Sequence, residues 1–134
     1  MSDTQPNVIP VTVKVWTEEG VVKFSCNPEP VPIDKGNCDV LITFTLDGTG
    51  FSFSPTNAVV PDKKSKSDFP VPSWTISDTL AALYDRNHAA AHVKYTVNVI
   101  DAQGNPHSHD PEIQNGGALG EGLRPCTNGR SADG

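Results

Sequence analysis

The sequence predicts an all-β protein, an immunoglobulin-like antiparallel β-sandwich of about seven short strands with at most one short helix. Three observations lead to this prediction. Apolar and polar residues alternate in several stretches, which is the period of a half-buried strand. β-branched and aromatic residues are frequent within these stretches. Turn residues separate the stretches at short intervals, as in sandwiches.

The first two predicted strands form a hairpin. In VIPVTVKVW (residues 8–16) one face carries only apolar side chains, those of Ile9, Val11, Val13 and Val15. The segment TEEG is a turn, and VVKFSC (residues 21–26) returns as the second strand. Trp16 falls on the polar face of the first strand, where it is a candidate contact residue.

A proline-rich segment and two more strands follow. NPEPVPIDKGN (residues 27–37) is expected to be extended but outside any ladder, because proline lacks the backbone donor. CDVLITFTL (residues 38–46) alternates and is the third strand, and after DGTG a fourth short strand occupies FSFS (residues 51–54). Residues 55–72 carry four prolines and are expected to cross between the two sheets.

The second half of the domain holds the only predicted helix. SWTIS (residues 73–77) is expected to be a strand with Trp74 in the core, and SDTLAALYDRNH (residues 77–88) a short helix capped by Ser77 or Asp78. AHVKYTVNVID (residues 91–101) has the clearest alternation in the chain. It leads through AQGN into NPHSHDPEIQN (residues 105–115), the last predicted strand region.

The domain boundaries follow from composition. Residues 1–7 are predicted to be a flexible arm, residues 8–115 the sandwich domain, and the glycine-rich residues 116–134 a flexible tail. The chain carries 16 acidic and 10 basic residues, a net charge of -6, which argues against a nucleic-acid partner. No signal peptide or membrane-spanning segment is evident, so a cytoplasmic location is expected.

The three cysteines form no metal-binding or redox motif. Cys26, Cys38 and Cys126 are not arranged as CxxC, and in the cytoplasm they are expected to be reduced and structural. A disulfide between Cys26 and Cys38 is the alternative if the protein is exported. No feature of the sequence favours pairing either thiol with a histidine for nucleophilic catalysis.

Two short motifs give a family resemblance. The segment NPEPVPI with Pro28, Glu29 and Pro30, and the segment DPEIQN with Asp110, Pro111 and Glu112, resemble the small bacterial DP-EP family. The resemblance covers roughly residues 8–115. It implies an immunoglobulin-type sandwich and no activity, because the function of that family is unknown.

The segment NPHSHDPEIQN also suggests a metal site. His107 and His109 are two residues apart, so on a strand both rings project from one face, about 7 Å apart. His92, His88 and Asp110 are candidates to complete a site for zinc, nickel or copper. The strand register decides the outcome, since a shift of one residue would turn His107 and His109 toward the core.

A structural interpretation of the same segment remains open. Asp110 and Pro111 would then kink an edge strand and discourage edge-to-edge pairing, with Ile113 returning to the core. The sequence contains no recognisable catalytic constellation. The first functional hypothesis is therefore a non-enzymatic module acting through an unknown protein partner or self-association, without a cofactor or membrane contact. The second hypothesis is a metal-binding domain.

Overall fold

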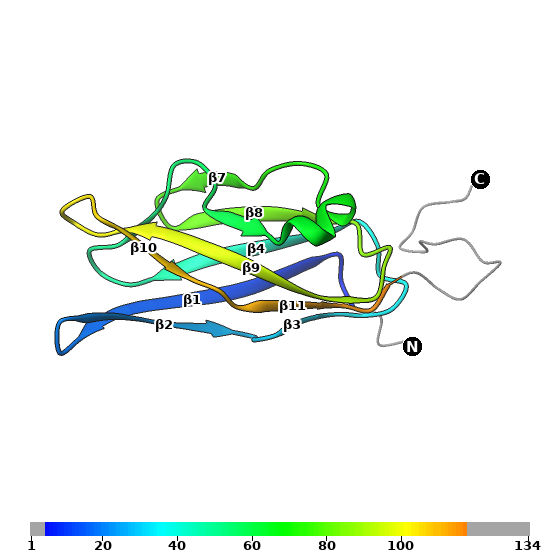
Figure 1. Ribbon diagram of the computed structural model, residues 1–134, viewed down its shortest axis with the longest axis horizontal. Coiled ribbons are helices and arrows are strands. Elements are labelled where there is room, and N and C mark those ends of the chain that lie inside the picture. The colour runs from blue at the N-terminus through cyan, green and yellow to red at the C-terminus, as the bar shows by residue number, and fades with distance from the viewer. Residues whose placement is uncertain (1–4, 118–134) are drawn as a thin grey trace.

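The computed structural model describes residues 5–117, which form an all-β sandwich, as predicted (Figure 1). The described strands are β1 (Val8–Glu18), β2 (Val21–Asn27), β3 (Val31–Ile33), β4 (Val40–Asp47), β5 (Ser52–Phe53), β6 (Val59–Pro61), β7 (Trp74–Ser77), β8 (Leu80–Asp85), β9 (Ala91–Ile100), β10 (Pro106–His109) and β11 (Glu112–Asn115). A single 3-10 helix, η1 (Lys63–Asp68), interrupts them within this range.

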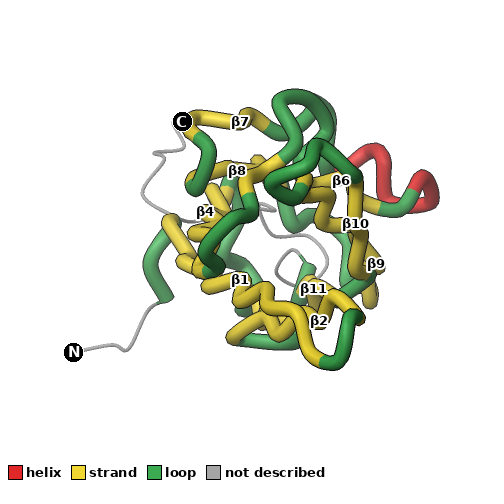
Figure 2. Tube along the Cα trace, turned by 90° about the vertical axis from the view of Figure 1, so that its left-hand side faces the viewer, coloured by secondary structure: helices red, strands yellow, loops and turns green. Residues whose placement is uncertain are grey.

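The strands make two sheets that face each other. The first has the order β2-β1-β4-β8-β7, and the second β10-β9-β11-β3, with β5 and β6 pairing with β9. Figure 2 shows the two layers end-on. Most pairs are antiparallel, but β1 runs parallel to β4 and β3 parallel to β11. The sandwich is therefore mixed, and it has more strands than the alternation alone indicated.

The alternating faces of the sequence form the core. Every second residue is buried along β4, from Ile9 to Val15 in β1 and from Val93 to Val99 in β9. The largest fully buried side chains include Phe44 and Tyr95, whose ring centroids lie 5.6 Å apart between the two sheets. Burial of these faces against one another is the main stabilising contribution to the fold.

The predicted helix at residues 77–88 is wrong. Leu80–Asp85 is strand β8, which pairs with β4 along its whole length and with β7 across a tight turn. Ala81 and Leu83 are fully buried in this arrangement. Pairing with a long central strand thus overrides the helical preference of the Leu-Ala-Ala-Leu stretch. Trp74, expected in the core, is 48% exposed because it lies on the edge strand β7.

The proline-rich segment does contribute a strand. β3 pairs with β11 along three residues and forms the edge of the second sheet. Pro32 is tolerated there because an edge strand leaves one side of its backbone unpaired. The long connection at residues 55–72 contains β6 and η1, and β6 pairs with β9.

The ends of the described region are hydrogen-bonded to the domain. Gln5 Oε1 accepts from the Asp34 amide at 2.8 Å, although residue 5 falls within the predicted arm. Gly116 N donates to Ile33 O at 2.8 Å, and Gly117 N donates to Asn87 Oδ1 at 2.9 Å. Residues 1–4 and 118–134, the rest of the predicted arm and tail, lie outside the described residues.

Two further sequence expectations concern the cysteines and the membrane. Cys26 is a free thiol and Cys38 is disulfide-bonded, so these two residues do not pair with each other. The expectation of reduced cysteines therefore fails at Cys38. Within residues 5–117 no helix has the length and apolar character needed to cross a membrane.

Candidate metal centre

The register between β9 and β10 decides where the predicted histidine ligands point. His107 pairs with Val99 and His109 with Val97. Directly paired residues share one face of a sheet, and both valines are fully buried. His107 and His109 therefore face inward at the edge of the core. His92 lies on the outer face of β9 with its side chain 69% exposed.

His107 is engaged within its own hairpin. Its Nε2 atom lies 2.9 Å from Asp101 Oδ2, and its ring meets Phe51 edge-on with centroids 6.2 Å apart. The hydrogen bond with His107 is the main cause that lowers the pKa of Asp101 below its ordinary value, with the amides of Asn105 and Gln103 adding to it. This pair fixes the β9–β10 turn.

His92 and His88 each contact a different neighbour. His92 Nδ1 is 3.9 Å from Glu112 Oε1 on the outer face of the second sheet. His88 follows β8, and its Nδ1 is 3.4 Å from the Arg86 guanidinium. The predicted set of four histidines is thus not brought together, because the β9–β10 register separates its members onto two faces.

One group of histidine, cysteine and acidic side chains in residues 5–117 has the geometry to hold a metal ion. We call it the seam cluster; it consists of Cys26, Glu29 and His109. Its three ligand atoms all lie within 4.8 Å of one another, and Glu29 Oε1 is 3.9 Å from His109 Nε2. A tetrahedral zinc ion sets its ligands about 3.4–3.8 Å apart. Small movements of these side chains would bring the three donors to such separations.

The strand order explains why these three residues meet. Cys26 lies near the end of β2, an edge of the first sheet, and His109 ends β10, which lies at an edge of the second. The two edges approach each other along one seam of the sandwich. There the His109 ring stacks on Phe24, with centroids 5.2 Å apart and planes within 8°. This stacking holds the imidazole beside the end of β2.

The parallel pair β3–β11 places the two motif segments side by side. Ile113 pairs with Val31, so the segments before these strands, Glu29-Pro30 and Asp110-Pro111, are neighbours. Pro28 and Pro30 both follow cis peptide bonds. Pro111 is buried between β10 and β11, and its carbonyl accepts a hydrogen bond from Tyr95 N of β9 at 3.0 Å. The strand that follows it, β11, lies between β9 and β3 and is not the kinked edge strand that the structural interpretation expected.

Asp110 and Trp16 do not contribute to the seam cluster. Asp110 Oδ1 accepts a hydrogen bond from Thr96 Oγ1 at 2.8 Å, which ties it to β9. Trp16 is 40% exposed, and its indole N–H donates to Glu18 Oε1 at 3.2 Å. It is a surface residue of the β1–β2 hairpin.

Burial controls the electrostatics of the seam cluster. Desolvation, and after it the charge of Glu29, raises the pKa of Cys26 to about 11, so the thiol is protonated at neutral pH. The pKa of Tyr95 is raised by burial and then by the nearby Cys26 and Glu29. Its hydroxyl is buried beside the thiol, and among the described residues it has no hydrogen-bond partner within the usual distance and angle limits.

These properties favour metal binding over nucleophilic catalysis. A catalytic cysteine needs a lowered pKa to supply thiolate, whereas the pKa of Cys26 is raised. A bound divalent cation displaces the thiol proton. The charges of a thiolate, a carboxylate and a neutral imidazole then sum to −2 and balance a divalent cation such as Zn²⁺.

Sequence reasoning found His109 but missed the other two members. Cys26 was interpreted as structural and Glu29 as a motif residue. The available signal was the spacing of Cys-Asn-Pro-Glu (residues 26–29) at the end of a strand. What the sequence could not supply is the meeting of this segment with β10, because the two belong to different sheets.

A second polar group lies at the far end of the β3–β11 pair. We call it the end cluster; its residues, Asp68, Asp85, Asn87 and Asn115, are all at most 5% exposed. Asn115 Nδ2 donates to Asp85 Oδ1 at 3.1 Å, and Asn87 N donates to the same oxygen at 2.9 Å. Burial, assisted by the charge of Asp68 and opposed by these two hydrogen bonds, raises the pKa of Asp85 to about 7.

No protein-family model matches this chain, and the search of curated proteins found no relative.

Proposed function

We propose that this protein is a metal-binding β-sandwich domain that holds one zinc ion between Cys26, Glu29 and His109. The observation that carries the proposal is the convergence of these three different donors at the seam between the sheets. Sulfur, imidazole nitrogen and carboxylate oxygen are the three donor types that Zn²⁺ accepts in proteins. Three protein ligands leave the fourth position of a tetrahedral ion for water or a substrate.

The surroundings of the cluster support a bound ion. Phe24 orients the His109 ring, so little side-chain freedom is lost on binding. The buried Tyr95 hydroxyl lies beside Cys26 and would donate a hydrogen bond to the thiolate that the metal creates. The half-exposed Glu29 and His109 give an ion access from solvent.

Calorimetric titration with Zn²⁺ tests this function. The full chain is expected to bind one ion with a Kd on the order of 1 μM or tighter. Cys26→Ala, Glu29→Gln and His109→Gln each remove one donor, and each is expected to weaken binding, with Cys26→Ala weakening it about 100-fold. His107→Gln is the matched control and should bind as the wild type does. Equal affinity in Cys26→Ala and the wild type would refute the proposal.

A second candidate function, contact with a protein partner or a second copy of the chain, is supported by β7. This edge strand carries two large exposed side chains, Trp74 at 48% and Ile76 at 59%. An unpaired strand edge with apolar side chains is a template for strand addition. Sedimentation of the wild type and of Ile76→Lys tests this candidate. Concentration-dependent association that the lysine abolishes would support it, and a monomer at all concentrations would exclude self-association.

Membership of the DP-EP family also remains a proposal. It is supported by the neighbouring positions of Glu29-Pro30 and Asp110-Pro111 ahead of the parallel strands β3 and β11. A family defined by these two dipeptides would have a structural reason to keep both, since each begins one strand of the same pair.

A further inference from the structure

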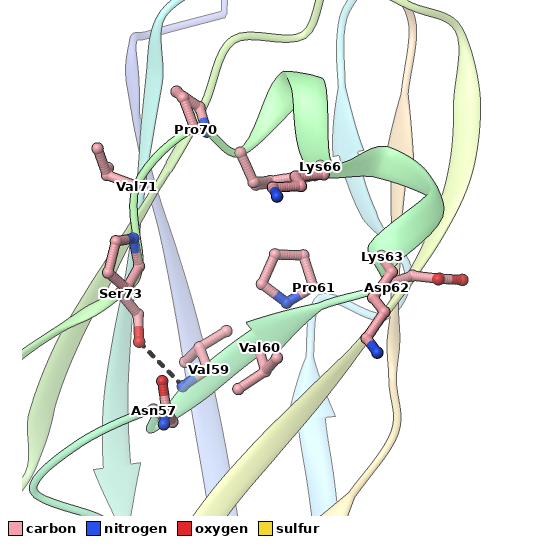
Figure 3. A pocket seen from close by; sticks show the side chains of 12 residues that line it. Asn57, Val59, Val60, Pro61, Asp62, Lys63, Lys66, Pro70, Val71 and Ser73 are labelled. Carbon is pink, nitrogen blue, oxygen red and sulfur yellow. Dashed lines mark hydrogen bonds between the residues drawn. The ribbon is translucent and has the colours of Figure 1, made fainter.

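A groove distinct from the seam cluster lies along β6, which flanks β9 on the side opposite to β10. It has a volume of about 540 Å³ and is formed by β6, η1 and the segment from Phe69 to Ser73 (Figure 3). This volume is within the range of small-molecule sites. Seven of the twelve lining residues are valine, proline or phenylalanine. The walls are therefore suited to an apolar chain.

Two lysines line the groove. These are Lys63 and Lys66 of η1, and in Figure 3 the Lys66 side chain extends over the Pro61 ring. The carboxylate of Asp62 points away from the groove, and its Oδ1 accepts a hydrogen bond from Lys64 N at 3.0 Å. Within residues 5–117 neither ammonium group is paired with a carboxylate. In a chain of net charge -6, these two lysines give the groove a local positive charge.

The backbone of the groove is closed to strand addition. The Val59 amide donates to Ser73 Oγ at 3.2 Å, as the dashed line in Figure 3 shows. Pro61 has no amide hydrogen, and Val60, the residue between them, pairs with Thr96 of β9. A peptide strand would find no free ladder here. The groove therefore selects ligands through apolar contact and charge.

We propose that this groove binds a small amphiphilic carboxylate, with an apolar chain of about eight carbon atoms along the valine and proline walls. The carboxylate pairs with the ammonium group of Lys66, and Lys63 adds positive charge farther along the groove. The exposed Val60 and Val71, each 39% exposed, contact the chain at the rim. The site uses none of the residues of the seam cluster, so its occupancy is independent of metal.

NMR titration of the full chain with sodium octanoate tests the proposal. Octanoate is expected to bind with a Kd on the order of 1 mM or tighter. The amide resonances of Val60, Lys66 and Val71 should shift most. Octanol, of equal chain length without charge, should bind at least fivefold more weakly. Equal binding of octanol and octanoate would overturn the role of the lysines, and shifts centred on β7 would overturn the site.

Two matched double variants test whether octanoate binding depends on the lysines of the groove or on the total charge of the protein. Lys63→Gln with Lys66→Gln should weaken octanoate binding about fivefold to tenfold. Lys23→Gln with Lys35→Gln removes the same total charge from exposed positions elsewhere and should leave binding unchanged. Equal loss in both double variants would contradict the proposal. Tighter binding of a tetrapeptide that ends in valine with a free carboxylate would overturn the assignment to a small molecule in favour of a peptide terminus.

Discussion

The seam cluster and the end cluster lie at opposite ends of the same parallel pair, β3 and β11, and differ in how their polar atoms are satisfied. In the end cluster, both Asp68 oxygens accept backbone amides at 3.1 Å, and both side-chain groups of Asn87 are hydrogen-bonded. In the seam cluster, the Glu29 and His109 side chains are 38% and 34% exposed and lie 3.9 Å apart.

The difference distinguishes a cluster that stabilises the fold from a cluster that can bind a ligand. The end cluster is buried and its hydrogen bonds hold three loops together, with only Asp85 Oδ2 and Asn115 Oδ1 left without a partner among the described residues, so a ligand has little access to it from solvent. The donors of the seam cluster are oriented by strand edges and ring stacking, and weak contacts leave them available for an ion. A polar cluster is therefore a candidate binding site when its geometry is fixed, its hydrogen-bonding capacity is not used and its donors are reached from solvent.

The largest expected effect is in the end cluster. Asn87 Nδ2 donates to the carbonyls of Asp34 and Asn37 at 2.9 Å each, and Asn87 Oδ1 accepts from Gly117 N. Asn87→Gly keeps the positive φ of 55° accessible but removes all three bonds. We expect a loss of about 5 kcal/mol in the free energy of unfolding.

Urea denaturation measures this loss. Asn105→Gly, at an exposed position of the β9–β10 turn, is the matched control and is expected to change stability by less than about 1 kcal/mol. A similar small effect for Asn87→Gly would mean that the hydrogen bonds of the end cluster do not hold the loops.

The next effect is a pH dependence carried by Asp85. Its pKa rises from 3.8 to about 7 on folding, so the folded state holds the proton more tightly than the unfolded state. The resulting stability is fully present below about pH 4 and is lost as the pH rises to 7, a total of about 4 kcal/mol. The protonated acid offers a hydrogen at Oδ2, which is otherwise buried without a partner.

The Asp85→Asn variant tests whether the pH dependence of stability comes from the Asp85 proton or from other titrating groups. The amide keeps an acceptor for Asn87 N and places donors where the proton would be. Its stability is therefore expected to vary much less between pH 4.5 and 8 than that of the wild type. Denaturant midpoints at several pH values provide the measurement, and parallel profiles for the two proteins would contradict a raised Asp85 pKa.

Zinc is expected to stabilise the fold through the seam cluster. At a free zinc concentration about 100 times the Kd, the free energy of unfolding rises by about 2.7 kcal/mol if the ion binds only the folded state. Thermal unfolding with and without zinc detects this shift, which should disappear in Cys26→Ala and persist in His107→Ala. An undiminished shift in Cys26→Ala would place the ion elsewhere.

The smallest effect concerns the β9–β10 turn. His107 hydrogen-bonds Asp101, which lowers the pKa of that exposed carboxyl. His107→Ala should return the Asp101 pKa toward its ordinary value while leaving the fold intact. Titration followed by NMR of the Asp101 carboxyl checks this, and an unchanged pKa would mean that the turn amides alone stabilise the carboxylate.

Much of the sandwich could be predicted because alternation is a local signal. Val11 and Val13 in β1 and Val97 and Val99 in β9 were all placed on buried faces by their spacing. The strand Leu80–Asp85 was missed because its apolar residues also fit a helix, and only pairing with β4 decides between the two.

The candidate site was less predictable because it depends on register and on contacts between sheets. A one-residue change in the β9–β10 pairing would move His109 from the inner face to the outer face. No local pattern places Cys26 beside it, since the two residues lie in different sheets and are joined by no strand pairing. The spacing of His107 and His109 pointed to one residue of the seam cluster, and the structure places that residue beside Cys26 and Glu29.

The most direct test of the central claim is X-ray absorption at the zinc edge on the full chain loaded with one equivalent of zinc. We expect one sulfur at about 2.3 Å and nitrogen or oxygen ligands, including one imidazole, at about 2.0–2.1 Å. The sulfur contribution should vanish in Cys26→Ala. A wild-type spectrum with only nitrogen and oxygen ligands would contradict a metal centre at Cys26, Glu29 and His109.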